Sequence, residues 1–158
     1  MRAGNGRGAQ RGFTYVWLLA LVAVLGIGLA AAGPLWAEEA KREREAELLR
    51  VGQSYAEAIA RYHRMSPGSV KRFPTELDQL LTDTRFVGTV RHLRTLYPDP
   101  VTRGQPWALV RAPDGGIQGV ASQSAEPPLR VTAVELGAVH LSAAQRYSDW
   151  RFIAPTAP

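Results

Sequence analysis

The side chains of this sequence that could do chemistry are three histidines, a few serines and scattered acidic residues. His63, His92 and His140 lie far apart, and none has the His-x-x-Glu-His or paired-histidine spacing of a zinc site. We interpret His63 as a solvent-facing helical residue and His92, in the sequence Arg-His-Leu-Arg, as part of a basic surface. No serine lies in a Gly-x-Ser-x-Gly motif. We therefore expect a protein that is not an enzyme.

A bound metal ion is the other chemistry to weigh. The sequence Asp114-Gly115-Gly116 could form part of a calcium or phosphate loop, but no second acidic residue lies near it, which favours a simple turn. Calcium takes six to eight oxygen ligands, usually from several acidic residues. Glu126, Glu135 and Asp149 are far apart in the sequence. We therefore expect no metal site and no cofactor.

Composition excludes further classes of site. The chain has no cysteine, so it has no disulfide, no thiol nucleophile and no thiolate metal site. The net charge is +5, but Arg2, Arg7 and Arg11 lie in the first twelve residues. Without them, 16 Lys and Arg stand against 14 Asp and Glu, which lowers the net charge to +2. Charge therefore gives no support to nucleic-acid binding.

The element that would position everything else is an apolar segment at residues 13–36. Its 24 residues include no Asp, Glu, Lys, Arg, His, Asn or Gln. As a helix it would be about 36 Å long, which exceeds the ~30 Å hydrocarbon core of a bilayer. A helix also satisfies its own backbone hydrogen bonds in lipid. We therefore predict a transmembrane helix over 13–36.

Such a segment has more than one use. It could be a plain signal anchor that holds an outer domain, or the apolar core of a cleaved signal peptide, although it is long for the latter. Lys and Arg flank it equally, with three on each side, so the positive-inside rule leaves the orientation undecided.

The junction Arg11-Gly12-Phe13-Thr14 favours a third interpretation. A basic leader that ends in Gly, followed by Phe-Thr and an unbroken apolar helix, resembles the type IV prepilin class, and most of all the pseudopilins of type II secretion. The resemblance implies that a prepilin peptidase cuts between Gly12 and Phe13 and methylates the new N-terminal Phe13.

Other residues of the segment carry the resemblance further. Pro34 would be the twenty-second residue of the processed chain, where pilin-class helices often have a proline, and Gly26 and Gly28 lie where these helices are weak. Gly and Pro both destabilise a helix interior. The sequence departs from the family at Trp17, because the family usually has Glu at this fifth position of the processed chain. Trp17 cannot form the ion pair that such a Glu makes with a neighbouring N-terminus.

Beyond the membrane segment, residues 37–65 are predicted to continue the helix. Leu48, Val51, Tyr55, Ile59 and Tyr62 recur at steps of three and four, which is one apolar helical stripe. The charged run before them is interpreted as solvated. The stripe requires a sheet to pack on.

The segment 66–153 is predicted to be a small head domain. We expect a short helix from an N-cap at Thr75 to about Leu81, and a turn or short helix within 86–97. A β-hairpin is predicted from 107–111 and 117–121, and 129–136 could form a further strand. The alternating segment 147–153 is expected either to close the sheet or to pack across it. Residues 154–158 are expected to fray. The fold class is therefore α+β: a long N-terminal helix on a small antiparallel sheet, as in pilins.

The resemblance implies a function as well as a fold. The chain would be a structural subunit of a type II secretion pseudopilus or related filament, stored in the inner membrane with residues 1–12 in the cytoplasm and the head in the periplasm. Its partners would be the prepilin peptidase, other pilin-like subunits and, indirectly, a platform protein and an assembly ATPase. The alternative is an anchored periplasmic binding or accessory protein that never polymerises.

Overall fold

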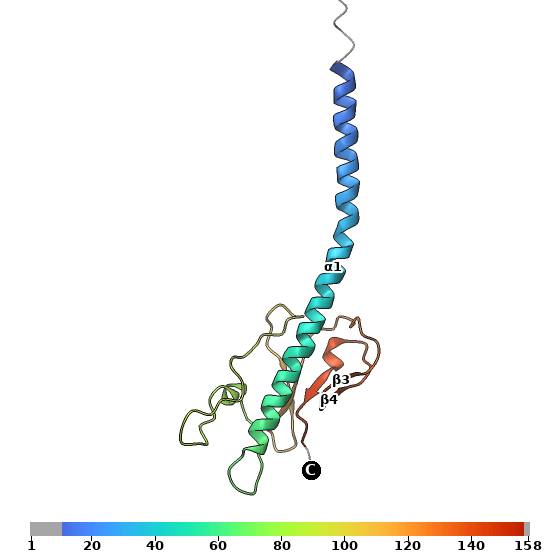
Figure 1. Cartoon of the computed structure of the whole chain (residues 1–158). Coiled ribbons are helices and arrows are strands. Elements are labelled where there is room, and N and C mark those ends of the chain that lie inside the picture. The colour runs from blue at the N-terminus through green and yellow to red at the C-terminus, as the bar shows by residue number, and fades with distance from the viewer. Residues whose placement is uncertain (1–10, 157–158) are drawn as a thin grey trace, which may run out of the picture. The chain divides into compact units, whose positions relative to one another are not determined.

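The computed structural model describes residues 11–156, apart from the side chains of residues 11, 12 and 30–35 (Figure 1). The expected leader at 1–12 therefore lies largely outside the described residues. The fold is of the α+β class, as predicted. Its elements are α1 (Arg11–Arg64), η1 (Leu77–Leu80), β1 (Ala108–Arg111), β2 (Ile117–Ala121), β3 (Val134–Leu136), β4 (Val139–Leu141), η2 (Tyr147–Asp149) and β5 (Arg151–Ile153).

The chain divides into two units. The first ends at Ala40, and the second, here called the head unit, begins at Lys41. Both expected helical segments, 13–36 and 37–65, lie in α1, whose 54 residues end one residue before the expected end. The first unit contains the early part of α1, and the head unit contains its last turns and all the strands.

The core of the head unit forms around the predicted stripe of α1. Leu48, Val51, Tyr55, Ile59 and Tyr62 are all buried, at 5 % exposure or less, so this prediction is confirmed. They share one cluster with buried residues of the strands, among them Ile117, Val120 and Phe152. Burying such a side chain contributes about 1.5–3 kcal/mol, so the stripe is a main source of the head unit's stability.

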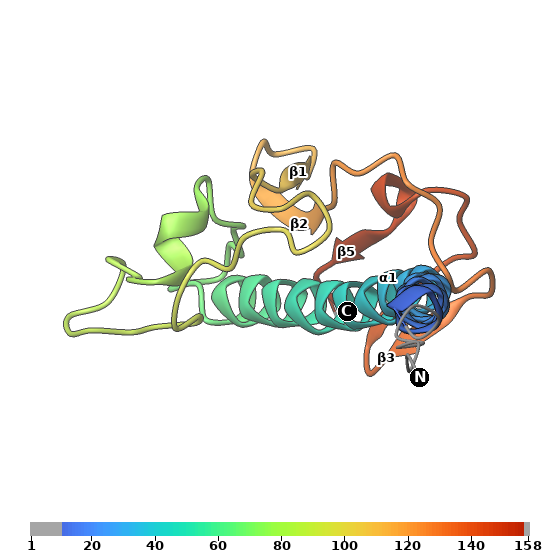
Figure 2. The ribbon, with the colours of Figure 1, turned by 90° about the horizontal axis from the view of Figure 1, so that it is seen from above.

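Helix and sheet are in close contact at Gly52, the only glycine in the head-unit part of α1. Figure 2 shows β2 and β5 alongside this part of the helix. A Cβ atom at Gly52 would lie 2.4 Å from Cδ1 of Phe152. The absence of a side chain therefore lets the ring of β5 rest on the helix backbone.

The main sheet has three antiparallel strands in the order β1-β2-β5. The hairpin of β1 and β2 is confirmed, and its turn uses Gly115, whose φ of 84° favours glycine. The side chain of Asp114 accepts a hydrogen bond from the N–H of Gly116 at 3.0 Å, as expected for a turn. The C-terminal segment closes the sheet, because β5 pairs with β2.

A second sheet consists of the β3–β4 hairpin alone. The predicted strand at 129–136 was too long, because only Val134–Leu136 is extended and paired. Its partner, β4, was not predicted. The N–H of Leu129 donates at 2.6 Å to the carboxylate of Glu45 in α1. The start of the predicted strand is therefore bonded to the helix and not to another strand.

The segment between α1 and β1 corrects one prediction and decides between two alternatives. Helix η1 is a 3-10 turn whose N-cap is Glu76, not Thr75, and no side chain caps it. Instead the amide of Gln79 donates to the Thr75 hydroxyl and accepts from the Thr75 N–H, at 3.0 Å each. No helix forms within 86–97, where Val90 makes an isolated bridge with Asp83.

The C-terminal end is more ordered than expected. Ala154 is 4 % exposed, and its N–H donates at 2.8 Å to the carbonyl of Gln118. The prediction that fraying begins at residue 154 is therefore wrong, because this hydrogen bond extends the β2–β5 pairing. Residues 157 and 158 lie outside the described residues.

Candidate functional site

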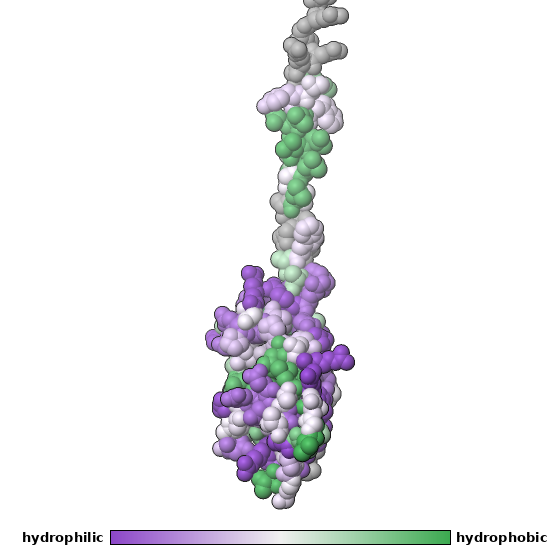
Figure 3. All heavy atoms as spheres, turned by 90° about the vertical axis from the view of Figure 1, so that its left-hand side faces the viewer, coloured by the Kyte–Doolittle hydropathy of each residue, from purple (hydrophilic) through white to green (hydrophobic). Residues whose placement is uncertain are grey.

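The residues that carry the sequence-based hypothesis lie in the first unit. The structure describes the side chains of residues 13–29 of α1, and this stretch is here called the apolar helix segment. Its large apolar side chains are all more than half exposed; they are Phe13, Tyr15, Val16, Trp17, Leu18, Leu19, Leu21, Val22, Val24, Leu25, Ile27 and Leu29. Figure 3 shows apolar residues at the surface of this segment, whereas the head surface mixes polar and apolar residues. Exposed apolar area of this extent is typical of surfaces that bind lipid or protein.

The proposed cleavage point lies at the start of this helix. Gly12 and Phe13 are in the first turn of α1, which begins at Arg11. Phe13 is 69 % exposed. The side chain on the C-terminal side of the expected junction is therefore exposed on the helix.

The remaining candidate residues follow along the same helix. Trp17 is 63 % exposed. A Cβ atom at Gly26 or Gly28 would meet nothing within 4 Å, so neither glycine is required by packing in the monomer. Thr14 and Pro34 also lie in α1, and the side chain of Pro34 is outside the described residues.

Among the residues whose placement is described, no helix has a stretch that is both long and apolar enough to cross a membrane. The predicted transmembrane segment, 13–36, includes residues 30–35, whose side chains are outside that description.

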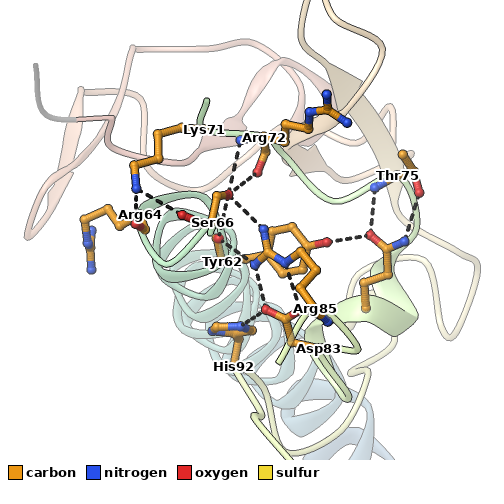
Figure 4. A network of polar contacts seen from close by, with 10 residues as sticks. Tyr62, Arg64, Ser66, Lys71, Arg72, Thr75, Asp83, Arg85 and His92 are labelled. Carbon is orange, nitrogen blue, oxygen red and sulfur yellow. Dashed lines mark hydrogen bonds and ion pairs between the residues drawn. The ribbon is translucent and has the colours of Figure 1, made fainter. Parts of the chain in front are cut away.

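Several polar networks lie in the head unit, and the first closes the C-terminal end of α1 (Figure 4). The guanidinium of Arg85 donates through Nε and Nη2 to the carboxylate of Asp83, at 2.8 and 2.6 Å. It also donates to the hydroxyl of Ser66 and to the carbonyl of Tyr62, at 2.8 and 2.9 Å. The same group lies over the Tyr62 ring, 3.5 Å from its centroid. A cation at this end of a helix binds its unpaired carbonyls and stabilises its dipole.

His92 belongs to this network and is not a surface residue, contrary to the prediction. Its side chain is 2 % exposed, and Nε2 lies 3.0 Å from Asp83, which is fully buried. The hydrogen bonds from Arg85 hold the pKa of Asp83 well below its usual range, against the opposing effect of burial, and the bond with His92 lowers this pKa further. Arg85 and His92 thus compensate a buried carboxylate, so the arrangement stabilises the loop.

The second network anchors Glu45, which was expected to lie in a solvated charged run but is 3 % exposed. Its carboxylate accepts from the N–H of Leu129 at 2.6 Å and from the hydroxyl of Tyr147 at 2.9 Å, and Arg130 lies 3.5 Å away. Burial, and then the hydrogen bond with Glu45, raise the pKa of Tyr147. Glu45 therefore ties α1 to two distant parts of the chain.

The other residues considered for chemistry are dispersed. His63 is half-buried and stacks on Phe73, with ring centroids 4.3 Å apart, and His140 pairs with Glu135 across the β3–β4 hairpin. Within the described part of the chain, no three His, Asp or Glu side chains form a group that could hold a metal ion. The structure brings together Asp83 and His92, which the sequence did not connect.

Asp99, which lies between Pro98 and Pro100, is a further buried acidic residue. Its carboxylate accepts from the N–H of Val101 at 2.9 Å and from the hydroxyl of Ser122 at 2.6 Å. Asp and Asn commonly close turns in this way, so the sequence signal for the local bond was present. The bond with Ser122 depends on the tertiary fold.

No family model matches this chain, and the comparisons with curated proteins and with solved structures find no match.

Proposed function

We propose that this chain is a structural subunit of a type II secretion pseudopilus or of a related pilin-like filament. The observation that carries the proposal is the apolar helix segment, whose large side chains are exposed from Phe13 onward, directly after a Gly–Phe junction. A basic leader before such a junction is the pattern on which the resemblance to prepilins rests.

The exposed side chains require an apolar environment. Each large apolar side chain gains about 1.5–3 kcal/mol when it leaves water, and twelve of them lie on one short helix. Lipid supplies this environment before assembly, and the same helices of neighbouring subunits supply it afterwards. Ala20, Ala23, Gly26 and Gly28 are small enough to let helices approach closely in either setting.

The head unit fits a mechanical role. Its core joins the last turns of α1 to the sheet, and its polar networks fasten loops to this helix. In the proposed mechanism, the subunit is held in the inner membrane with its head in the periplasm. The prepilin peptidase cuts after Gly12, and a platform protein and an assembly ATPase drive its extraction and stacking on other subunits.

Trp17 distinguishes this subunit from the usual pattern of the family. A Glu at this position would be costly in lipid unless it were paired, whereas Trp needs no such partner. The subunit would therefore assemble without the ion pair to a neighbouring N-terminus, through packing of the apolar helix segment alone.

Mass spectrometry of the N-terminal peptide from the membrane-extracted protein tests the proposal. The expected terminus is a methylated Phe13. The variant Gly12→Leu should keep its first residues and still insert into the membrane, whereas the matched variant Gly8→Leu should be processed normally. A native chain that keeps Met1 contradicts the filament proposal and supports the anchored protein, and a chain that begins at Glu38 supports a secretory signal.

Polymerisation can be tested separately because the chain has no cysteine. A single Ala23→Cys substitution, cross-linked in membranes that contain the assembly machinery, should give covalent dimers, because the one thiol of each chain can link it to one neighbour. Gln145→Cys, an exposed position in the head unit, serves as the matched control. Monomers only, from a correctly processed chain, would leave a membrane-anchored protein that does not polymerise.

A further inference from the structure

The positive charge of the head unit is concentrated in one segment. Residues 61–94 contain seven Lys and Arg but only three Asp and Glu. From Phe13 onward, the remainder of the chain has nine Lys and Arg against eleven Asp and Glu. The whole positive excess of the processed chain therefore lies where α1 ends and the following loops begin.

A hollow of about 400 Å³ lies in the same segment. Pro67, Val70 and Phe73 give it apolar walls, Gln79 is a polar group within it, and Arg72 and Arg85 are its cations. Val70 is 65 % exposed, so an apolar side chain is already presented to solvent at its edge. Binding sites of this size typically combine apolar walls with a few polar groups.

The cations of the segment differ in how far they are compensated. Arg85 is paired with Asp83 at 2.6 Å, and Lys71 donates to the carbonyls of Arg64 and Ser66, which carry no net charge. Arg64 and Arg72 are exposed, and within the described residues neither forms an ion pair. Figure 4 shows their guanidinium groups pointing away from the polar network. These two groups can therefore bind an external anion without breaking an internal contact.

We propose that this end of the head unit is a docking surface for an acidic peptide segment of a partner protein. An apolar side chain of the partner would occupy the hollow beside Val70 and Phe73. Its carboxylates would pair with Arg64 and Arg72, because an uncompensated basic surface selects a partner of opposite charge. The apolar walls distinguish this partner from a simple polyanion, which could use the cations but not the hollow.

This inference does not depend on the proposed filament, since an anchored protein could use the same surface. The experiment therefore uses the full chain in detergent, with or without its leader. Binding of two fluorescein-labelled peptides is measured by anisotropy: an acidic peptide of Asp and Glu around a central Leu-Phe pair, and its counterpart with Lys at every acidic position. The acidic peptide should bind, and its affinity should fall as salt is raised.

Variants identify the surface. Arg72→Glu replaces an attraction with a repulsion and should weaken binding of the acidic peptide about tenfold, as should Arg64→Glu. Arg151→Glu makes the same charge change on β5 and should leave the affinity unchanged. Val70→Ser should weaken the Leu-Phe peptide more than an acidic peptide with Ser-Ser at its centre.

Three outcomes would overturn the inference. Equal binding of the acidic and the Lys peptide excludes charge selection, and unchanged binding by both Arg64→Glu and Arg72→Glu excludes this surface. Equal affinity for the Leu-Phe and Ser-Ser peptides, with displacement by a single-stranded oligonucleotide or by anionic vesicles, identifies a general polyanion surface instead. The circular dichroism spectrum of each variant is compared with that of the unmodified chain. Matching spectra show that none of these results reflects unfolding.

Discussion

Gly52 of α1 and Phe152 of β5 are packed so closely that a Cβ atom on the glycine would lie 2.4 Å from Cδ1 of the ring. Phe152 is completely buried, so its ring cannot move into solvent to make room. The helix and the sheet therefore meet at a position where only glycine fits.

Gly52→Ala should destabilise the head unit although alanine is the better helix former. The helix preference favours alanine by about 1 kcal/mol, but overpacking a core costs about 1–3 kcal/mol. The expected net loss, measured by urea denaturation of the full chain in detergent, is up to about 2 kcal/mol. Glu57→Ala, at an exposed position of the same helix, should change the stability by less than about 0.5 kcal/mol. A stabilised Gly52→Ala variant would contradict the contact.

Glu45→Ala should cost about 2–4 kcal/mol, because it removes a buried acceptor of two hydrogen bonds and leaves the donors of Leu129 and Tyr147 unpaired. Tyr147→Phe removes only one of these bonds and should cost about 1 kcal/mol. Glu47→Ala removes an exposed pair with Arg50 and should have little effect. Equal stabilities of the Glu45 and Glu47 variants would show that the buried network is not needed.

Asp83→Asn should lower the free energy of unfolding by about 3 kcal/mol near neutral pH, because Arg85 and His92 would lose a buried charged partner. The folded-state pKa of Asp83 lies below its unfolded value, so its contribution is present above about pH 4 and is lost as the pH falls further. The variant should therefore show a weaker dependence of stability on acid pH, measured by urea denaturation at several pH values. Asp78→Asn, at an exposed position, is the control, and the same acid dependence in both variants would contradict the assignment.

Tyr55 is expected to stabilise the fold at neutral pH and to lose this contribution at high pH, whereas Asp83 loses its contribution at low pH. Burial raises its pKa to about 12, while its hydroxyl donates at 3.0 Å to the carbonyl of Tyr97. The folded-state pKa exceeds the ordinary value of about 10, so the contribution of this residue is present below pH 10 and is lost as the pH rises through the folded-state value. Tyr55→Phe should cost about 1 kcal/mol at neutral pH and should reduce the loss of stability in alkali. An unchanged alkaline profile would show that Tyr55 ionises without penalty.

Several features of the fold followed from local sequence patterns. The stripe from Leu48 to Tyr62 predicted the buried face of α1, because apolar side chains at helical spacing share one face. The β1–β2 hairpin was predicted by two apolar runs around Asp-Gly-Gly, since this turn needs a residue with positive φ. Neither inference requires knowledge of distant parts of the chain.

The polar residues were predicted less well. His92 was assigned to the surface because its neighbours are arginines, yet it is buried against Asp83. Glu45 was assigned to a solvated run because charged residues surround it, yet it accepts hydrogen bonds from Leu129 and Tyr147. A polar side chain is buried only where the fold brings it partners, and those partners lie far away in the sequence.

The sequence by itself determined the apolar helix, the amphipathic stripe and the hairpin. Each of them depends on the pattern of residues that are close to one another in the sequence. The tertiary structure alone decided that Gly52 receives the ring of Phe152 and that three carboxylates, those of Glu45, Asp83 and Asp99, are buried in the head. These features depend on contacts between distant segments, whose energies exist only after the chain has folded.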